Sequence, residues 1–243
     1  MPVLVVIPAR LGSTRLPRKP LQPLGGVPLI VRVAERVQGY GVADRLVIAT
    51  DAEAIAAVAQ AAGFEAVLSS VLHPSGSDRV HEVSSRAEFG SYDEILNVQG
   101  DAPFVPAAAL LGALAQLRNG FALGTAAAPL AAEAAGNPAR VKVVVEPQGR
   151  ALYFSRAAIP FGAEAYWLHL GVYAFTRSSL RRFATAAPSR LELLEGLEQL
   201  RALELGLSIG VARLQEPAGP AIDTLEDLRA AEELWTVTQE VSR

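Results

Sequence analysis

The sequence predicts an α/β protein, and three features lead to that class. Short apolar runs rich in β-branched residues alternate with longer stretches of helical period, as in a sheet with helices on its faces. The 243 residues are 51% hydrophobic and 19% charged, a balance that excludes disorder and allows one or two domains. No internal repeat and no glycine-, serine- or charge-rich linker interrupts the chain, so we expect a single domain over residues 1–243.

The first half of the chain follows a strand and helix rhythm. A first strand begins at Val3, and Pro28 marks the opening turn of a first helix. Thr50 to Glu53 has the pattern of a capping box at the start of the second helix. The expected strands of this half are residues 3–8, 45–49, 64–68 and 94–98, and the expected helices are residues 29–37, 53–62, 77–86 and about 106–117.

In the second half the rhythm changes. Residues 141–145, 152–154 and 170–175 are strand-like runs with little helix between them, which predicts an antiparallel extension of the sheet within about residues 138–205. Such an extension suits a small substrate or dimer lobe. We then expect a helix over residues 191–203, a strand over 209–214, and a closing helix over 224–235 that is capped by Thr224 with Asp227 three residues on.

The composition excludes several classes of protein. Lysine and arginine total 22 against 25 acids, and the resulting net charge of -3 argues against a protein that coats nucleic acid or anionic lipid. The absence of cysteine excludes disulfides, thiolate metal sites and thiol catalysis. No apolar run approaches the ~18 residues that span a bilayer, and the N-terminus lacks the features of a signal peptide. We therefore expect a cytoplasmic protein.

The loop after the first strand concentrates positive charge. Ligands of open α/β sheets bind beyond the carboxyl ends of the strands, and this loop is far longer than the usual ~2 to 6 residues. A Gly12-Ser13-Thr14 turn offers backbone N–H groups that could cradle phosphate oxygens. Lys19 is one of only two lysines, so a compact point charge is indicated there. The alternative is a solvated basic loop. The loop contains four cations and no acid: Arg10, Arg15, Arg18 and Lys19.

Two aspartates are candidate metal ligands. Asp101 follows the fourth expected strand, where a carboxylate facing a polyphosphate could hold magnesium, which prefers one or two carboxylates plus phosphate oxygens. Asp223, at the head of the last expected helix, is a candidate second ligand. Simpler roles remain open, because Asp101 could cap the helix that begins near Pro106, and Asp223 could be a favourable charge at a helix N-terminus.

Other patterns are absent. No Walker P-loop and no Gly-x-Gly-x-x-Gly follows a strand, which disfavours P-loop kinases and nicotinamide dehydrogenases. The three histidines form no zinc pattern and no Gly-x-Ser-x-Gly elbow occurs, so zinc and serine hydrolases lack support. Arg156, His169 and Tyr173 could line one pocket for an acidic substrate, although a lone histidine beside a strand is more often structural.

Seven motifs in order along the chain resemble the CMP-Kdo synthetase family, the 3-deoxy-manno-octulosonate cytidylyltransferases. The first alone would indicate only the wider nucleotidyltransferase group, which includes CMP-sialate synthetases. The Gln-Gly-Asp, Ser-Arg, His-Leu-Gly-x-Tyr and Glu-Gln-Leu-Arg set selects the Kdo branch. The motifs are Val6–Leu21, His73–Arg79, Asn97–Asp101, Tyr153–Arg156, His169–Tyr173, Leu197–Arg201 and Ile222–Thr224.

The resemblance implies a Rossmann-like three-layer nucleotidyltransferase fold, of the nucleotide-diphospho-sugar transferase type, with a mixed central sheet and a small antiparallel lobe. It implies a homodimer that transfers a cytidylyl group from CTP to Kdo, with Mg2+, for lipopolysaccharide-type glycan biosynthesis. The implied catalytic residues are Arg10, Lys19, Asp101 and Asp223, of which Asp101 and Asp223 share the metal. The implied nucleotide contacts are Arg10, Ser13, Arg15, Lys19, Ser75, Gly76, Arg79 and Asp101, and the implied sugar contacts are Gln99, Arg156, His169, Tyr173, Glu198 and Gln199.

Three features depart from the family pattern. Arg18 stands where the family commonly has glycine, Ala102 where it commonly has glutamate, and the connection from Pro160 to Tyr166 is short. The short connection bears on which acid sugar is used. Two alternatives therefore stay open: the same CTP chemistry on sialic acid or an amino analogue of Kdo, and a non-catalytic nucleotide-binding module.

Overall fold

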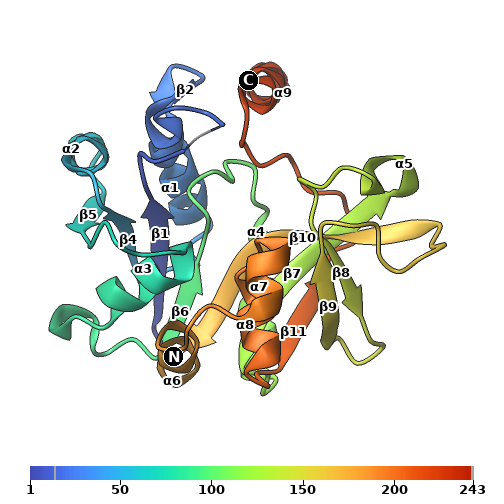
Figure 1. The fold of residues 1–243 in the computed structure, drawn as a ribbon. Helices are drawn as coiled ribbons and strands as arrows, with labels where there is room; N and C mark the ends of the chain where they lie inside the picture. Colours follow the sequence, from blue (N-terminus) through green and yellow to red (C-terminus); the bar gives the residue numbers. More distant parts are fainter. Residues whose placement is uncertain (14, 242–243) are drawn as a thin grey trace. The chain divides into compact units, whose positions relative to one another are not determined.

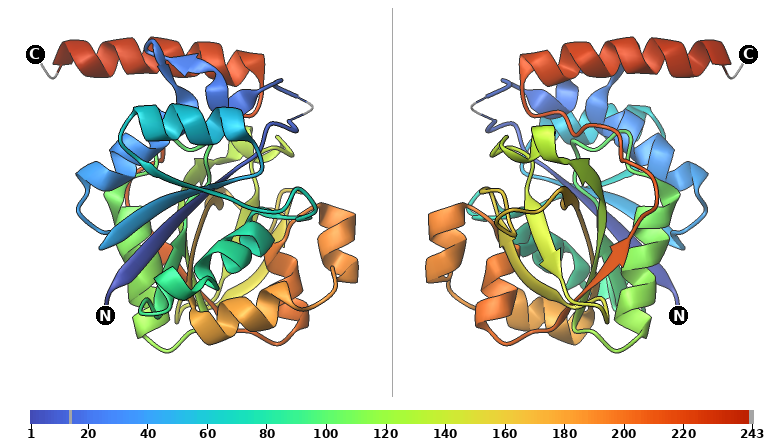
Figure 2. Two further views of the ribbon diagram at one scale, coloured as in Figure 1. Left: turned by 90° about the vertical axis from the view of Figure 1, so that its left-hand side faces the viewer. Right: turned by 90° about the vertical axis from the view of Figure 1, so that its right-hand side faces the viewer.

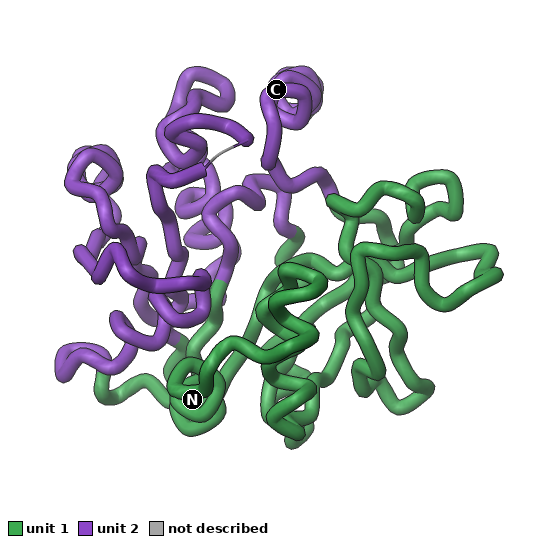
Figure 3. The backbone as a smooth tube through the Cα atoms, viewed as in Figure 1, with its two compact units in different colours: residues 1–3, 90–97, 106–218 green, residues 4–89, 98–105, 219–243 purple. Residues whose placement is uncertain are grey.

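The computed structural model describes residues 1–13 and 15–241, with side chains described as far as residue 237. Backbone contacts group the chain into two compact units, coloured separately in Figure 3. Unit 1 contains residues 1–3, 90–97 and 106–218, and unit 2 contains residues 4–89, 98–105 and the chain from Gly219 onward. The single domain expected from the sequence stays a prediction, because this grouping does not test whether either unit folds alone.

Unit 2 is built on three parallel strands, β1 (Val3–Ala9), β4 (Arg45–Thr50) and β5 (Glu65–Leu68), with β4 in the middle (Figure 1). All seven residues of β1 are buried. A strand with no exposed face reads as a continuous apolar run, which is why the Val-Leu-Val-Val-Ile stretch predicted it correctly. The carboxyl ends of β1 and β5 lead into segments that carry candidate site residues, Lys19 after β1 and Ser75 after β5.

In the described residues of unit 2 the α-helices are α1 (Leu29–Gly39), α2 (Glu53–Ala61), α3 (Gly76–Ser84) and α9 (Leu225–Val241). The buried residues of α1 recur at helical spacing and form one apolar face. Before α1 the chain forms the short helix η1 (Lys19–Leu21) and a hairpin of β2 (Pro23–Leu24) and β3 (Val27–Pro28). Both views of Figure 2 show α9 alongside this hairpin. A further short helix is η2 (Ala87–Phe89).

Unit 1 contains a mixed sheet in the order β11 (Ile209–Arg213), β7 (Leu123–Ala131), β10 (Ala165–Thr176) and β6 (Glu94–Asn97). β11 and β7 are parallel, whereas β10 is antiparallel to both β7 and β6. β8 (Lys142–Val145) and β9 (Ala151–Ser155) form an antiparallel pair, and β8 also pairs with β10. The antiparallel extension predicted for this half of the chain is confirmed.

The helices of unit 1 are α4 (Ala107–Arg118), α5 (Ala132–Ala135), α6 (Arg177–Ala184), α7 (Arg190–Glu195) and α8 (Gln199–Glu204). α4 packs against β7 at a point where β7 has Gly124. A Cβ atom added to Gly124 would overlap the carbonyl oxygen of Ala113. Glycine at this position therefore lets the backbones of helix and strand approach closely.

Two expected elements were wrong in detail. The helix predicted over residues 191–203 is two helices, because Gly196 ends α7 in the left-handed conformation with φ 62°. The capping box predicted at Thr50 to Glu53 does not form, since the residue that precedes α2 is Ala52 and no side chain caps it. The carboxylate of Asp51 instead accepts a hydrogen bond from Arg79, at 2.9 Å.

Within the described part of the chain, none of the helices combines the length and the apolar character needed to span a bilayer.

Candidate active site

A cluster of opposite charges in unit 2 brings together three residues that lie far apart in the sequence. Lys19 Nζ donates to Asp101 Oδ2 at 2.6 Å and to Asp223 Oδ1 at 2.9 Å. Arg15 Nη2 lies 3.2 Å from the same oxygen of Asp223. The side chain of Lys19 is only 16% exposed, so the solvated-loop alternative does not hold for this residue.

Each member is carried by its own segment. Lys19 opens the short helix η1. Asp101 follows β6, and the neighbouring Gly100 runs so close to the end of β1 that a Cβ there would lie 2.9 Å from the Pro8 carbonyl oxygen. The Ile222 N–H donates to the Asp101 carbonyl oxygen at 2.9 Å, which places Asp223 beside Asp101.

The structure excludes the cap role considered for Asp101, and the favourable helix-end charge considered for Asp223 stays a prediction. The residue that precedes α4 is Pro106, with no side-chain cap, so Asp101 does not cap that helix. The start of α9 is capped by Thr224 and Asp227: the Asp227 N–H donates to Thr224 Oγ1 at 3.1 Å, and the Thr224 N–H donates to Asp227 at 2.8 Å. The predicted cap by Thr224 is confirmed, and Asp223 is left to bind Lys19.

The electrostatics of the cluster favour the charged forms. Burial alone would lower the pKa of Lys19, but the charges and hydrogen bonds of Asp101 and Asp223 raise that pKa above its ordinary value. Burial would likewise raise the pKa of Asp223, and the charges of Lys19 and Arg15 outweigh it and lower that pKa. The cluster is therefore an ion network at neutral pH.

The donor set of this cluster fits a magnesium ion. Both carboxylates direct an oxygen at one cationic atom, within 2.9 Å of it, so both could bind one divalent ion. The described residues hold no group of three or more histidine, cysteine or acidic side chains suited to a metal. A site with two carboxylates is typical of Mg2+, which keeps the rest of its shell for water and phosphate oxygens.

The basic loop before Lys19 adopts a defined path. Arg10 is exposed at the end of β1. The Ser13 N–H donates to the Leu11 carbonyl at 2.8 Å, and the Ser13 hydroxyl accepts from the Leu16 N–H at 3.3 Å. Thr14, the third residue of the predicted phosphate-binding turn, lies outside the described residues. The phosphate contacts of Arg10 and Ser13 stay a prediction.

Arg18 is the one non-glycine residue with positive φ in the described chain, at φ 53°. This is the left-handed region, which costs an ordinary residue ~1 kcal/mol and glycine almost nothing. The position therefore suits the glycine that the family pattern predicts there. We expect Arg18→Gly to raise the free energy of unfolding slightly, by up to about 1 kcal/mol, and Arg18→Ala to leave it unchanged. Urea denaturation of both variants measures the difference, and a destabilised Arg18→Ala would show a contact that holds Arg18 in place.

The start of α3 carries a second group of predicted nucleotide contacts. Ser75 caps this helix by accepting from the Asp78 N–H at 3.2 Å. Gly76 lies against Pro8 and Gln99, since a Cβ at Gly76 would be 3.3 Å from Pro8 Cγ and 3.4 Å from Gln99 Oε1. Gln99, expected at the sugar, therefore lies in unit 2 beside the start of α3.

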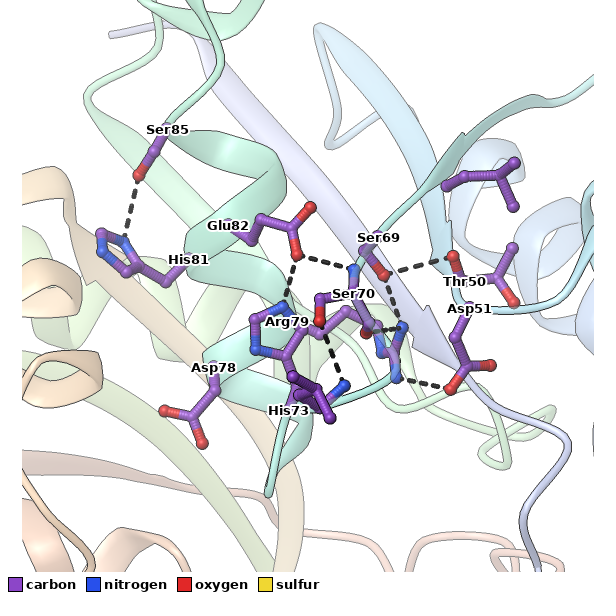
Figure 4. A network of polar contacts seen from close by, with 12 residues as sticks. Thr50, Asp51, Ser69, Ser70, His73, Asp78, Arg79, His81, Glu82 and Ser85 are labelled. Atoms are coloured by element: carbon purple, nitrogen blue, oxygen red, sulfur yellow. Dashed lines mark hydrogen bonds and ion pairs between the residues drawn. The ribbon is translucent and has the colours of Figure 1, made fainter.

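Arg79 is enclosed in a polar network (Figure 4). Its side chain is 3% exposed and donates to Asp51 Oδ2 at 2.9 Å, Ser69 Oγ at 2.5 Å and the Ser70 carbonyl at 3.2 Å. These bonds join α3 to the loops after β4 and β5. Sequence reasoning missed Asp51 as the partner because it assigned that residue to a helix cap. The expected nucleotide contact of Arg79 stays a prediction.

A separate polar cluster in unit 1 contains three of the predicted sugar-binding residues. The Tyr173 hydroxyl donates to Gln199 Oε1 at 3.0 Å, and Gln199 Nε2 lies 3.5 Å from His169 Nδ1. On the other side of the imidazole, Nε2 lies 3.0 Å from Thr125 Oγ1, whose own proton goes to the Val172 carbonyl at 2.6 Å. Thr125 was not predicted, because β7 was not predicted.

These bonds determine the protonation of His169. Because Thr125 donates its hydroxyl proton elsewhere, it can only accept from the imidazole, so Nε2 carries the proton. Nδ1 is then the acceptor for the Gln199 amide. Burial lowers the pKa of His169 to about 3, so the ring is neutral at physiological pH. Burial, with a smaller contribution from the charge of Glu198, raises the pKa of Tyr173, which keeps its proton.

A neutral His169 predicts a loss of stability in acid. The pKa in the folded state lies below the ordinary value of ~6.5, so on acidification the unfolded chain binds a proton first. Stability is therefore fully present above pH ~6.5 and is lost as the pH falls toward about 3, at up to ~1.4 kcal/mol per pH unit. We expect His169→Asn to have a shallower slope than wild type between pH 6 and 4.5 in urea denaturation. Equal slopes would mean that the histidine is protonated in the folded state.

Arg156, the remaining basic residue of the predicted sugar set, binds main-chain oxygens. Its guanidinium donates to the carbonyls of Glu195 at 2.7 Å, Pro138 at 3.0 Å and Gly196 at 3.2 Å. The Glu195 carboxylate accepts from Ser155 Oγ at 2.6 Å and from the Arg156 N–H at 2.9 Å. The structure thus groups His169, Tyr173 and Gln199 and gives Arg156 other partners. Sequence reasoning had no signal for Glu195.

Comparison with known proteins identifies the family. The family model described as cytidylyltransferase matches residues 4–209. A 3-deoxy-manno-octulosonate cytidylyltransferase of Gemmatimonas aurantiaca is 50% identical over 247 residues, which cover 98% of this chain and 95% of the relative.

Two solved structures extend the comparison. A CMP:2-keto-3-deoxy-manno-octonic acid synthetase complexed with CTP matches with a TM-score of 0.89 and 34% identity, covering 99% of this chain and 100% of that chain. HddC from Yersinia pseudotuberculosis complexed with GMP-PN has a TM-score of 0.68 at 11% identity over 97% of this chain, so it shares the fold. The α/β fold with a mixed sheet is confirmed. The chain belongs to the cytidylyltransferase family, and within it to the 3-deoxy-manno-octulosonate cytidylyltransferases, the CMP-Kdo synthetases.

Proposed function

We propose that the protein transfers a cytidylyl group from CTP to the anomeric hydroxyl of 3-deoxy-manno-octulosonate. The sugar oxygen forms a bond to the α-phosphorus of CTP, and the bond from that phosphorus to the β-phosphate oxygen breaks, which releases pyrophosphate and gives CMP-Kdo. The observation that carries the proposal is the full-length identity of 50% to a relative named for this activity. The cluster of Lys19, Asp101 and Asp223 supplies the charges that the reaction requires.

The roles of the residues follow from the charge of the reacting groups. Attack on a triphosphate requires positive charge around a polyanion and an oxygen nucleophile held in line, so catalysis consists mainly of positioning and electrostatics. Lys19, Arg10 and Arg15 would bind the phosphate oxygens. Asp101 and Asp223 would hold Mg2+, which when bound lowers the pKa of a coordinated hydroxyl and neutralises phosphate charge. Lys19 would then exchange its bonds to the carboxylates for bonds to phosphate.

The polar cluster of His169, Tyr173 and Gln199 in unit 1 would bind the sugar. A neutral His169 and a protonated Tyr173 offer directed hydrogen bonds rather than charge, which suits sugar hydroxyls. Glu198 and Gln199 would add carboxylate and amide partners, and the sugar contact of Gln99, which lies in unit 2, stays a separate prediction. We assign Arg156 to the sugar as well, and in the structure its guanidinium donates to main-chain carbonyls.

The test is pyrophosphate release with CTP and a panel of 2-keto sugar acids, with and without magnesium. We expect turnover with Kdo, a preference for CTP over ATP, and loss of turnover in excess chelator. Faster turnover with sialic acid or an amino analogue of Kdo would mean that this acid, and not Kdo, is the acceptor of the same cytidylyl transfer. No turnover with any acid would favour a non-catalytic nucleotide-binding module.

We also propose that the enzyme is a cytoplasmic homodimer in lipopolysaccharide-type glycan biosynthesis, as the family resemblance implies and as the frequency of isologous dimers among soluble oligomers favours. Light scattering tests the oligomeric state. A mass of 25.6 kDa at working concentration would contradict the dimer.

A further inference from the structure

The C-terminal helix α9 is fastened to the β2–β3 hairpin by contacts that the proposed reaction does not use. Both carboxylate oxygens of Glu232 accept from the Gly25 N–H, at 3.0 and 3.1 Å. Arg32, on α1, donates to the carbonyls of Leu24 at 3.0 Å and Gly25 at 2.8 Å. The guanidinium carbon of Arg32 lies 4.6 Å from the centre of the Trp235 ring, a cation–π contact. We call Glu232, Trp235 and Arg32 the α9 clasp.

Gly25 is required by the clasp for two reasons. Its φ of 57° is left-handed, and a Cβ atom there would lie 2.5 Å from Trp235 Nε1. The indole therefore packs directly against the hairpin backbone. The next residue, Gly26, also has a positive φ, of 75°, but a Cβ there would meet nothing within 4 Å. The two glycines share the backbone requirement and differ in the contact with Trp235.

The clasp also reaches the loop that bears Asp101. The rings of Phe104 and Trp235 lie 6.1 Å apart. Phe104 is three residues beyond Asp101, and it packs against Gly219, where a Cβ would lie 2.5 Å from Phe104 Cβ. Trp235 therefore contacts both the hairpin and the Asp101 loop.

Each of these segments is tied to one member of the charged cluster. The hairpin continues from η1, where the Gln22 N–H donates to the Lys19 carbonyl at 3.1 Å and the Leu29 N–H donates to the Gln22 carbonyl at 2.8 Å. α9 is joined to Asp223 through Asp227, which accepts from the Asp223 N–H at 3.1 Å. Trp235, on the helix that follows Asp223, thus contacts the hairpin that follows Lys19 and the loop that contains Asp101.

We propose that the α9 clasp positions Asp223 against Lys19 and Asp101, and that its residues are positioning residues for nucleotidyl transfer. Glu232 lies nine residues after Asp223, ~13 Å along a helix, and a helix moves as a rigid rod over that length. Loosening the clasp would let the start of α9 move away from η1. Only the kinetic consequence rests on the proposed function. The positioning of Asp223 and Lys19 can be tested without substrate.

Lys19 itself is the first reporter. The chain has two lysines, and the other, Lys142, is fully buried, so an acylating reagent for amines reaches only Lys19 and the N-terminus. Lys19 is held by two carboxylates and is 16% exposed, so it should react slowly in wild type. Loss of a charged hydrogen bond raises the population of an open form up to about tenfold. We therefore expect Glu232→Ala and Gly25→Ala to acylate Lys19 up to about tenfold faster than wild type does. Peptide mass spectrometry measures the acylation of Lys19, with the N-terminal amine as the internal reference.

Matched variants separate positioning from general effects. Glu233→Ala removes an exposed carboxylate from the same helix, and Gly26→Ala introduces the same backbone strain without contact to Trp235. Both should acylate Lys19 at the wild-type rate. Glu232→Gln keeps a hydrogen-bond acceptor, so its rate of Lys19 acylation should lie between those of wild type and Glu232→Ala. Wild-type acylation of Lys19 in folded Glu232→Ala and Gly25→Ala would overturn the proposal.

The kinetic arm asks whether the positioning matters for the reaction. We expect Glu232→Ala to lower kcat and raise the Mg2+ concentration for half-maximal rate, with the KM for the acid sugar unchanged. A purely structural clasp would lower the melting temperature and leave both kinetic quantities at wild type, which would overturn the catalytic part. If wild type shows no turnover, the proposed function fails, and the acylation arm still decides whether the clasp positions Lys19.

Discussion

Replacing Asp101 and Asp223 together with asparagine should be scarcely more damaging than replacing either one. If the two carboxylates hold one magnesium ion, each single variant loses an octahedral ligand that the ion does not readily replace. We expect each to lower kcat/KM by about a hundredfold or more, as for the loss of one preorganised charge. The second replacement then removes a ligand from a site that no longer works, so the losses are strongly non-additive.

The structure sharpens this test. Both carboxylates bind the same ammonium group, at 2.6 and 2.9 Å, so they are close enough to act on one ion. A helix-cap role for Asp223 would predict near-normal turnover in Asp223→Asn, because asparagine caps helices as well as aspartate does. The cap of α9 is made by Thr224 and Asp227, so a loss of activity in Asp223→Asn cannot come from a lost helix cap.

The measurement is a double-mutant cycle on pyrophosphate release over a range of Mg2+ concentrations. Asp93→Asn, which removes an exposed carboxylate in unit 1, controls for net charge. Unfolding in urea confirms that each variant folds. Full activity in Asp223→Asn would leave Asp101 as the sole protein ligand, and additive losses would mean that the two carboxylates act in separate steps.

The parts of the fold that the sequence predicted have strong local signals. β1 is a β-branched run buried throughout, and α1 repeats its apolar residues at helical spacing after Pro28, so pattern and structure agree. β7 was missed because its residues 123–131 are mostly alanine and glycine, which favour no strand by themselves. Its neighbours β10 and β11 make it a strand, and the small side chains let α4 approach.

In the candidate site, too, residues in local motifs were predicted from the sequence, whereas residues that act through distant partners were not. The meeting of Asp101 and Asp223 was foreseen from strand ends and family motifs, and the structure places both on Lys19. Thr125, Glu195 and Glu232 gave no signal, because each acts through a partner distant in sequence. Thr125 determines the tautomer of His169, and Glu232 binds a backbone N–H in a hairpin that no periodicity indicated. Such residues are identified only by the tertiary contacts that they make.

Lys19→Ala should abolish most nucleotide use and should also cost stability. As an exposed loop cation, Lys19 would contribute within about 0.5 kcal/mol, as surface residues usually do. The structure instead gives it two ion pairs and little exposure. Its removal leaves Asp101 and Asp223 as close like charges, so we expect the free energy of unfolding to fall by about 1 to 3 kcal/mol. We expect kcat/KM to fall by about a hundredfold or more, since a charge on the triphosphate is lost.

Magnesium distinguishes the causes of this loss. A divalent ion between the two carboxylates replaces the missing ammonium, so Mg2+ alone should raise the melting temperature of Lys19→Ala more than that of wild type. Lys19→Arg keeps the charge, but its planar guanidinium cannot place one compact charge between two oxygens as an ammonium does, so it should recover stability better than turnover. Full recovery of turnover by Lys19→Arg would show that charge alone suffices. Wild-type kinetics in a folded Lys19→Ala would return this loop to an ordinary surface segment and leave the two aspartates without a lysine partner in catalysis.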